Sequence, residues 1–299
     1  MNRKITKTFL GDHLGKTDDM RPELVETRCD LCGSANYKLL FEKEGFRHVR
    51  CHDCGLVFVN PRLKSHEEFQ RISGTGSMGE EQLSPAQIRR ICKELSIFGN
   101  YRKLNRILEI GAGKGWFLNV ARSLGWEIWA VEINWDAIAE LNQKGIRNVI
   151  TSSAEDFDAD PESFDAVRIW DVIEHLQSPR KCLEKVHGSL RPGGLLRVST
   201  TNFRSLSRMV NGRDWVYLNG SDHIVLFDPT TIEKLLKSIG FRRIKIRTRS
   251  FNLRRKLYHP EKELRLSFHP LAPFRKLIDE TIQFTRFGHQ LIVDAVKGP

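Results

Sequence analysis

The chain has no long apolar segment. Its 299 residues contain no hydrophobic run near the roughly 20 residues that a membrane-spanning helix needs. The basic N-terminal stretch also lacks the apolar core of about 7 to 15 residues that marks a secretory signal. These absences predict a cytoplasmic protein without a transmembrane segment, although peripheral contact with a membrane surface stays open. The length predicts about two domains of ~100 to 200 residues each.

Acidic residues are few relative to basic ones. The chain has 48 Lys and Arg against 37 Asp and Glu, a net charge of +11 and a pI near 9.5. The stretch from Lys234 to Lys256 contains no acidic residue at all. Such a charge favours an anionic partner, which leaves open a phosphorylated small molecule, RNA, an anionic membrane surface, or simply a solvated face. Because no RNA-binding signature accompanies the charge, we favour a small anionic ligand over nucleic acid.

Cysteine is sparse, but four of the six cysteines form two pairs. The pairs, Cys29 with Cys32 and Cys51 with Cys54, give the pattern C-x2-C-x18-C-x2-C. This spacing is typical of structural zinc sites, in which four thiolates complete a tetrahedron. Two disulfides do not suit a reducing compartment, and a catalytic dithiol needs only one pair. The pattern therefore predicts a zinc ribbon over residues 25–64, with iron as the alternative metal.

A glycine-rich turn follows an apolar strand in the segment RILEIGAGKG, residues 106–115. Glycine adopts positive φ and has no Cβ, so the main chain of Gly111, Gly113 and Gly115 can approach a nucleoside ligand closely. A second strand over residues 126–131 ends at Glu132, where an acidic residue can bind ribose hydroxyls. The spacing G-x-G-x-G departs from the G-x-G-x-x-G of dinucleotide-binding proteins, which favours a nucleoside cofactor without a pyrophosphate.

Strand and helix patterns alternate along the rest of this region. A helix is predicted from Pro85 onward because Ser84 is a suitable N-cap, and strands are predicted at 149–151, 163–171 and 195–200, with helices from 116, 135 and 179. This order predicts an α/β fold with a doubly wound parallel sheet. Residues 202–228 carry no regular pattern and are predicted to be an irregular binding loop or lid. A helix over 229–239 and two strands, near 241–250 and 288–297, complete the chain.

Several segments together resemble class I S-adenosylmethionine (SAM) dependent methyltransferases. The pattern E-x-G-x-G-x-G begins at Glu109, and SSAEDF (152–157), IWDVIEHL (169–176) and LRPGGLLRVST (190–200) are similar to later segments of that family. The front end, with CxLCG and CxxCGLVFVNPR, is similar to methyltransferases of sugars, surface glycans and secondary metabolites. Zinc-bearing ribosomal RNA guanine methyltransferases are the competing relatives, but they mix histidine into the metal set and this chain does not.

The resemblance implies a seven-stranded, Rossmann-like methyltransferase sheet with a small N-terminal zinc ribbon, the last two strands forming its antiparallel pair. The domains expected are an N-terminal tail (1–24), the zinc ribbon (25–64), a linker or lid (65–83) and the SAM-binding domain (84–299). The function it implies is methyl transfer to a small, anionic acceptor such as a nucleotide sugar, glycan or secondary-metabolite precursor. An RNA methyltransferase that uses the basic C-terminal patch and a non-catalytic interaction module are the alternatives.

The resemblance also implies roles for individual residues. His223 is the first candidate for acceptor contact or general base, and His175 is the second; a local capping or buttressing role is the alternative for both. Asp222 and Tyr217 are the expected neighbours of His223. The residues expected to bind the cofactor are Glu109, Gly111, Ala112, Gly113 and Gly115 (amino-acid end and loop), Glu132 and Ile133 (ribose), Ala154 and Glu155 (adenine), and Trp170 and Asp171 (methionine portion).

Overall fold

The computed structural model describes residues 23–64, 82–249 and 285–298. The predicted N-terminal tail and the predicted linker or lid lie almost entirely outside these residues. The chain divides into two compact units, and each is described by itself. The first unit comprises residues 1–73, 200–232 and 246–292, and the second unit comprises residues 74–199, 233–245 and 293–299.

The second unit begins with helix α2, Pro85–Gly99. Ser84 is its N-cap: the Ser84 hydroxyl accepts a hydrogen bond from the Gln87 amide, and the Gln87 side chain accepts one from the Ser84 amide at 2.7 Å. This reciprocal pair satisfies amides that the first helical turn leaves unbonded. The helix start predicted from Ser84 and Pro85 is thereby confirmed.

A seven-stranded mixed sheet runs in the order β12-β13-β10-β9-β6-β7-β8. The pairs β6–β7, β7–β8, β6–β9 and β9–β10 are parallel. This confirms the predicted seven-stranded sheet, with the last two strands of the chain at one edge. Its strands are β6 (Arg106–Ile110), β7 (Glu127–Glu132), β8 (Val149–Thr151), β9 (Phe164–Trp170), β10 (Leu190–Thr201), β12 (Phe241–Arg249) and β13 (Gln290–Lys297).

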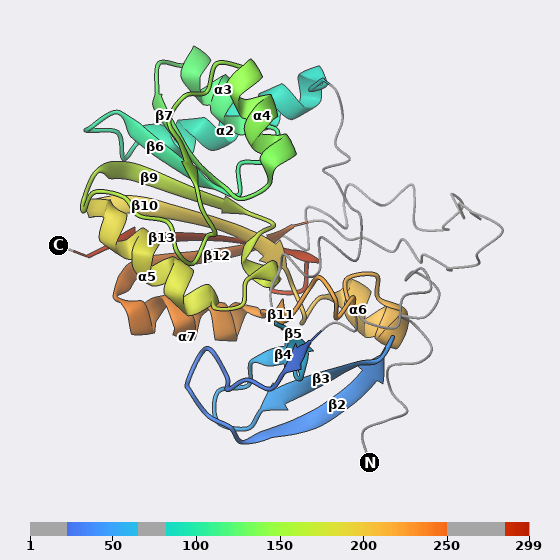
Figure 1. The fold of residues 1–299 in the computed structure, drawn as a ribbon. Coiled ribbons are helices and arrows are strands. Elements are labelled where there is room, and N and C mark those ends of the chain that lie inside the picture. Colours follow the sequence, from blue (N-terminus) through green and yellow to red (C-terminus); the bar gives the residue numbers. More distant parts are fainter. Residues whose placement is uncertain (1–22, 65–81, 250–284, 299) are drawn as a thin grey trace. The chain divides into compact units, whose positions relative to one another are not determined.

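Helices cover both faces of this sheet (Figure 1). Helices α2, α3 (Trp116–Ser123) and α4 (Trp135–Gln143) lie over one face, where they contribute to one buried apolar cluster. Helices α5 (Pro179–Ser189) and α7 (Pro229–Ile239) lie over the other face. Among the described residues, no helix is both long and apolar enough to span a membrane.

The strand order reverses between β6 and β9. From β6 the chain moves outward through β7 and β8, whereas β9 and β10 lie on the other side of β6. The loops that follow β6 and β9 touch: a Cβ added to Gly111 would lie 2.5 Å from Cγ2 of Val172. In doubly wound sheets, ligands bind at this reversal, outside the carboxyl ends of the strands. The fold therefore brings the glycine loop to the expected ligand crevice.

The first unit contains a four-stranded sheet in the order β11-β4-β3-β2 (Figure 1). Three of its strands belong to residues 23–64, which we call the cysteine module. The fourth, β11, comes from the segment 202–228, which the sequence predicted to be irregular. That prediction is wrong in part, because the segment contains α6 (Leu206–Asn211), the 3-10 turn η2 (Gly212–Asp214) and β11. The strands are β2 (Tyr37–Lys43), β3 (Phe46–Cys51), β4 (Val57–Val59) and β11 (Val225–Leu226), beside a separate pair of β1 (Leu24–Val25) and β5 (Arg62–Leu63).

One apolar core joins the cysteine module to the segment 202–228. Phe41 and Val57 of the module pack with Phe203, Trp215 and Leu226, all of them buried. Pairing of β11 with β4 adds backbone hydrogen bonds to this contact. The module therefore does not fold around the cysteines alone, since its sheet and core include residues of the segment 202–228, far along the chain.

Candidate cofactor and metal sites

The glycine loop leaves room for a ligand at its centre. Gly111 and Gly113 have φ of 67° and 50°, in the left-handed region that glycine favours. Whereas Gly111 faces Val172, a Cβ added to Gly113 would meet no atom within 4 Å. Ala112 lies between them and is nearly buried. The bare edge of the loop at Gly113 is therefore accessible to a bound molecule.

Glu132 ties this loop to the end of β7. One carboxylate oxygen accepts a hydrogen bond from the amide of Gly113 at 2.8 Å, and the other accepts from the amides of Ile133 and Asn134, both at 2.9 Å. Glu132 as a whole is only 8% exposed. Because an ionised carboxylate offers about four acceptor positions, these three bonds leave one for a further donor. The structure thus places Glu132 beside the loop, as the strand order required.

The third glycine of the loop serves packing. Gly115 has φ of 69°, and a Cβ there would lie 2.4 Å from Leu141 and 2.7 Å from Ile146. We expect Gly115→Ala to lower the free energy of unfolding by about 2 to 4 kcal/mol, from left-handed strain and overpacking together. Denaturant unfolding measures this. Gly99→Ala is the matched control, because a Cβ at Gly99 meets nothing within 4 Å; equal effects of the two changes would contradict this interpretation.

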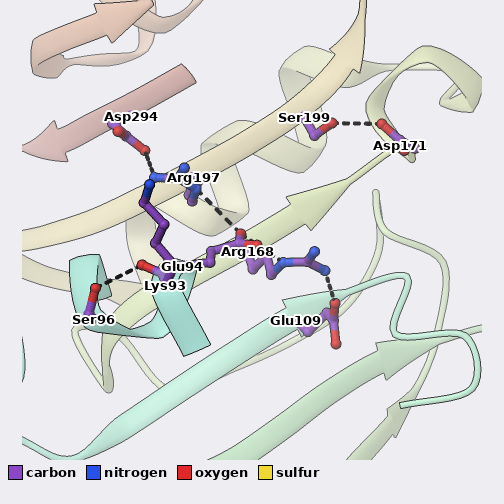
Figure 2. Close-up of polar contacts among 9 residues, drawn as sticks. All are labelled: Lys93, Glu94, Ser96, Glu109, Arg168, Asp171, Arg197, Ser199 and Asp294. Carbon is purple, nitrogen blue, oxygen red and sulfur yellow. Dashed lines mark hydrogen bonds and ion pairs between the residues drawn. The ribbon is translucent and has the colours of Figure 1, made fainter. Parts of the chain in front are cut away.

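Glu109 belongs to a buried ion-pair network (Figure 2). Arg168 of β9 contacts Glu109 of β6 through Nη1 and Glu94 of α2 through Nε, the latter at 3.0 Å. The second carboxylate oxygen of Glu109 is buried and has no hydrogen-bond partner among the described residues. Burial raises the pKa of Glu109 to about 7, although Arg168 pulls it the other way. An acceptor with a free lone pair is therefore held next to the glycine loop.

The network continues across the sheet to β10 and β13. Nε of Arg197 lies 3.3 Å from a carboxylate oxygen of Glu94, and Nη1 of Arg197 donates a hydrogen bond to a carboxylate oxygen of Asp294 at 2.7 Å (Figure 2). None of the motifs in the sequence includes Arg197 or Asp294, nor Glu94 or Arg168. A signal was available in the sequence, because each arginine stands between apolar residues of its strand, and charged side chains are rarely buried unless they are paired. The partners themselves, up to 97 positions apart, could not be read from local pattern.

The end of β9 is shaped by Asp171, which has φ of 53°. Its carboxylate accepts a hydrogen bond from the Ser199 hydroxyl at 2.7 Å (Figure 2). Its amide donates to the Ser199 carbonyl at 3.0 Å. A non-glycine residue in the left-handed region is a feature that often accompanies a functional turn. Trp170 precedes it, with the Arg168 guanidinium 4.2 Å from its ring centre.

The turn after β8 contains Ala154 and Glu155. The Glu155 carboxylate accepts a hydrogen bond from the amide of Gln177 at 2.8 Å. Burial raises the pKa of Glu155, while backbone donors counteract it. Glu155 thus holds the segment between η1 (Ile173–His175) and α5, a contact that the sequence did not indicate. His175 is the last residue of η1 and immediately precedes this segment.

In the first unit, Tyr217, Asp222 and His223 lie together, as expected from the sequence. The His223 ring centre is 5.6 Å from that of Tyr217, and His223 Nε2 is 3.9 Å from an Asp222 carboxylate oxygen. The amide of His223 donates to the carbonyl of Asn219 at 2.8 Å. The structure adds a residue that the sequence did not reveal: His289 stacks on Tyr217 with the ring centres 5.7 Å apart.

The four paired cysteines converge in the first unit. Cys29 and Cys54 sulfurs are 3.4 Å apart, Cys32 and Cys51 sulfurs are 3.5 Å apart, and all four lie within 4.8 Å of one another. All are free thiols. The amides of Gly33 and Gly55 donate back to Cys29 and Cys51 carbonyls at 2.7 and 3.1 Å, which closes two similar turns. Metal–sulfur bonds of about 2.3 Å in a tetrahedron put sulfurs about 3.8 Å apart, close to this spacing.

Comparison with known proteins identifies the family. A family model described as a methyltransferase domain matches residues 81–246, more than half of the chain. The chain is 24% identical over 191 residues to a ubiquinone biosynthesis O-methyltransferase of Rickettsia felis, covering 58% of this chain and 78% of that protein. A protein of the same name from Paraburkholderia phymatum is 24% identical over 127 residues, 40% of this chain and 53% of that one. The chain spans about half the length of most of the curated relatives it matches.

Solved structures share the fold. A phosphoethanolamine N-methyltransferase 2 of Haemonchus contortus, solved with phosphomonomethylethanolamine and S-adenosylhomocysteine, superposes with a TM-score of 0.54 at 21% identity, over 81% of this chain and 63% of that one. A SAM-dependent methyltransferase of Archaeoglobus fulgidus gives a TM-score of 0.50 at 24% identity, over 70% and 92%. The chain therefore belongs to the methyltransferase domain family and has the fold of the class I, SAM-dependent methyltransferases.

Proposed function

We propose that this protein transfers a methyl group from SAM to a small, anionic acceptor such as a nucleotide sugar, a glycan or a secondary-metabolite precursor. The observation that carries the proposal is the meeting of the glycine loop with the end of β9 at the reversal of strand order. SAM supplies a methyl group activated by a sulfonium. The protein's own contribution is then to align the acceptor and to exclude water.

The residues of the second unit fit SAM. The unpartnered oxygen of Glu109 is an acceptor for the ammonium of the donor's amino-acid end, and the open side of Gly113 admits it. The remaining acceptor position of Glu132 suits a ribose hydroxyl. Ile133, Ala112, Gly111 and Gly115 shape the loop around these groups, and Ala154 with Glu155 would flank adenine. Trp170 and Asp171 would flank the methionine portion.

His223 is the proposed acceptor-binding residue or general base. An acceptor that loses a proton near the transition state needs a group that takes it, and histidine does so near neutral pH. Asp222 and Tyr217, which lie against His223, would orient its ring. His175 is the second choice.

The cysteine cluster is the proposed site of a structural zinc ion, and the module around it is the proposed ribbon. Burial raises the pKa of Cys54 to about 11, so a cation must displace its proton to bind. With four sulfurs as ligands, no position stays open for a reacting molecule, which assigns the metal to folding. Iron in place of zinc would occupy the same ligands.

Titration and transfer together test the proposed function. We expect calorimetry to show saturable binding of SAM by the full chain, and transfer of labelled methyl to at least one compound in a panel of nucleotide sugars and glycan precursors. His223→Ala should lower turnover by about 100- to 10,000-fold, the usual contribution of a general base, and remove the rise of the rate with pH. Unchanged turnover and pH profile in His223→Ala would refute the base assignment.

Two alternative functions, RNA methylation and a non-catalytic interaction role, predict different results in the same experiments. The basic charge of the chain favours an RNA methyltransferase, which would bind RNA with a steep dependence on salt and methylate it in preference to the small acceptors. A non-catalytic interaction module would give no saturable heat with SAM. Both outcomes appear directly in the titration and transfer experiments.

A further inference from the structure

Two arginines of the first unit lie against the same aromatic ring. The guanidinium carbon of Arg208, in α6, is 4.3 Å from the ring centre of Phe203, and that of Arg50, in β3, is 5.9 Å from it. Guanidinium groups stack on aromatic rings by cation–π attraction. The arrangement brings two positive charges from positions 50 and 208 of the sequence to the same aromatic ring.

No carboxylate of the described residues forms an ion pair with either arginine. Nε of Arg208 is buried and has no hydrogen-bond acceptor there. Burial and the charge of Arg50 both lower the pKa of Arg208. In the sheet, Lys38 pairs with Arg50 and adds a third positive group nearby. An anion would supply the acceptor that the buried Nε of Arg208 lacks, and it would offset the repulsion that Arg208 experiences from Arg50.

The backbone around these residues is well fixed. The Phe203 amide donates to the Phe227 carbonyl at 2.8 Å, and the buried Ser205 caps α6 by accepting from the Arg208 amide at 3.2 Å. Arg50 stands in the middle of a four-stranded sheet, opposite Val57 of β4. The two guanidiniums therefore present their donors from regular elements, which reduces the entropy lost when a ligand binds.

We propose that Arg50 and Arg208, supported by Phe203, form a binding site for a phosphoryl group of the methyl acceptor. Guanidinium donors match phosphate oxygens in pairs, and such charge-assisted bonds are about twice as strong as neutral ones. The proposal rests on the proposed function, since it assigns the acceptor's anionic group. Phosphate recognition is thus assigned to Arg50 and Arg208, and not to the basic stretch that begins at Lys234.

The test measures binding of inorganic pyrophosphate to the full chain by calorimetry. We expect saturable binding that Arg50→Gln and Arg208→Gln each weaken by about tenfold or more. Arg208→Lys should also weaken it, because an ammonium keeps the charge but lacks the planar pair of donors. Arg213→Gln, an exposed arginine in η2, is the matched control for charge and should change the affinity by less than about twofold.

Several outcomes would overturn the proposal. They are no saturable binding to the natural sequence, equal weakening by all the glutamine variants, or full affinity in Arg208→Lys. Preferential binding of a single-stranded RNA oligonucleotide, weakened equally by Arg213→Gln, would overturn it in favour of RNA. The unaltered protein and each variant are also titrated with SAM. If the unaltered protein does not bind SAM, the proposed function is refuted. The pyrophosphate results decide the arginine site independently of that outcome. Should Arg208→Gln fail to fold, Arg50→Gln and Arg208→Lys still decide it.

Discussion

Stripping the proposed structural metal from the cysteine cluster is expected to unfold the cysteine module and, with it, a segment of the first unit that lies far from the cysteines in the sequence. Structural zinc sites contribute about 10 to 16 kcal/mol of apparent binding free energy at neutral pH, and this free energy is coupled to folding. The cysteine module pairs its β4 with β11 and shares its apolar core with Phe203 and Trp215. Loss of the module should therefore release the segment that carries His223.

Hydrogen exchange measures this release in the full chain treated with a chelator. The amides of Val59 and of β11 should lose protection, because Val59 donates to the Ile224 carbonyl at 2.9 Å and β11 is held by β4. The amides of β6 and β7, in the second unit, should keep their protection.

Elemental analysis should find one zinc or iron per chain before treatment with the chelator. Cys92→Ser is the matched control, since Cys92 lies in α2 outside the cluster and should leave the metal content unchanged. A metal-free chain with β11 still protected would contradict the expectation.

Replacing Glu109 by glutamine is expected to weaken SAM binding by about 10- to 100-fold, the usual effect of losing a hydrogen bond between charged groups. The change keeps the side-chain shape but removes the charge that the donor's ammonium would meet. Calorimetric titration with SAM measures it. Glu127→Gln is the matched control: Glu127 is a half-exposed residue of β7 that pairs with Arg106. Equal losses in the two variants would refute the assignment of Glu109.

The same titration should depend on pH. Burial raises the pKa of Glu109 from 4.5 to about 7, so the folded chain holds this proton more tightly than the unfolded chain. The contribution of Glu109 to the free energy of unfolding therefore decreases as pH rises from about 4.5 to about 7. Binding of a cationic group favours the ionised carboxylate, so SAM affinity should increase as pH rises through about 7. Glu109→Gln should abolish that increase, and a persistent pH dependence in this variant would assign it to another group.

Local patterns determined the elements of the second unit. Helix α2 begins where Ser84 and Pro85 predicted, and β6 passes into a loop of glycines whose positive φ no other residue adopts as cheaply. The apolar runs over β7 and β9 were placed to within a residue or two. These features depend on interactions between residues close in the chain, so composition and spacing suffice to reveal them. The spacing of the cysteines likewise indicated two C-x2-C turns, at Cys29–Cys32 and Cys51–Cys54.

Tertiary structure alone decided which distant residues meet. β11 is two residues long and has no periodicity, so its place beside β4 depends on partners much earlier in the chain, Phe58 for Val225 and Val57 for Leu226. The network that links Glu109 to Arg168, Glu94, Arg197 and Asp294 spans four strands and a helix, and its charges are tolerable only because the fold buries them together. The arginine pair on Phe203 arises in the same way. Sequence specified the strands and turns that a ligand would need, whereas long-range packing set the charges around them, because burial and pairing are properties of the folded chain.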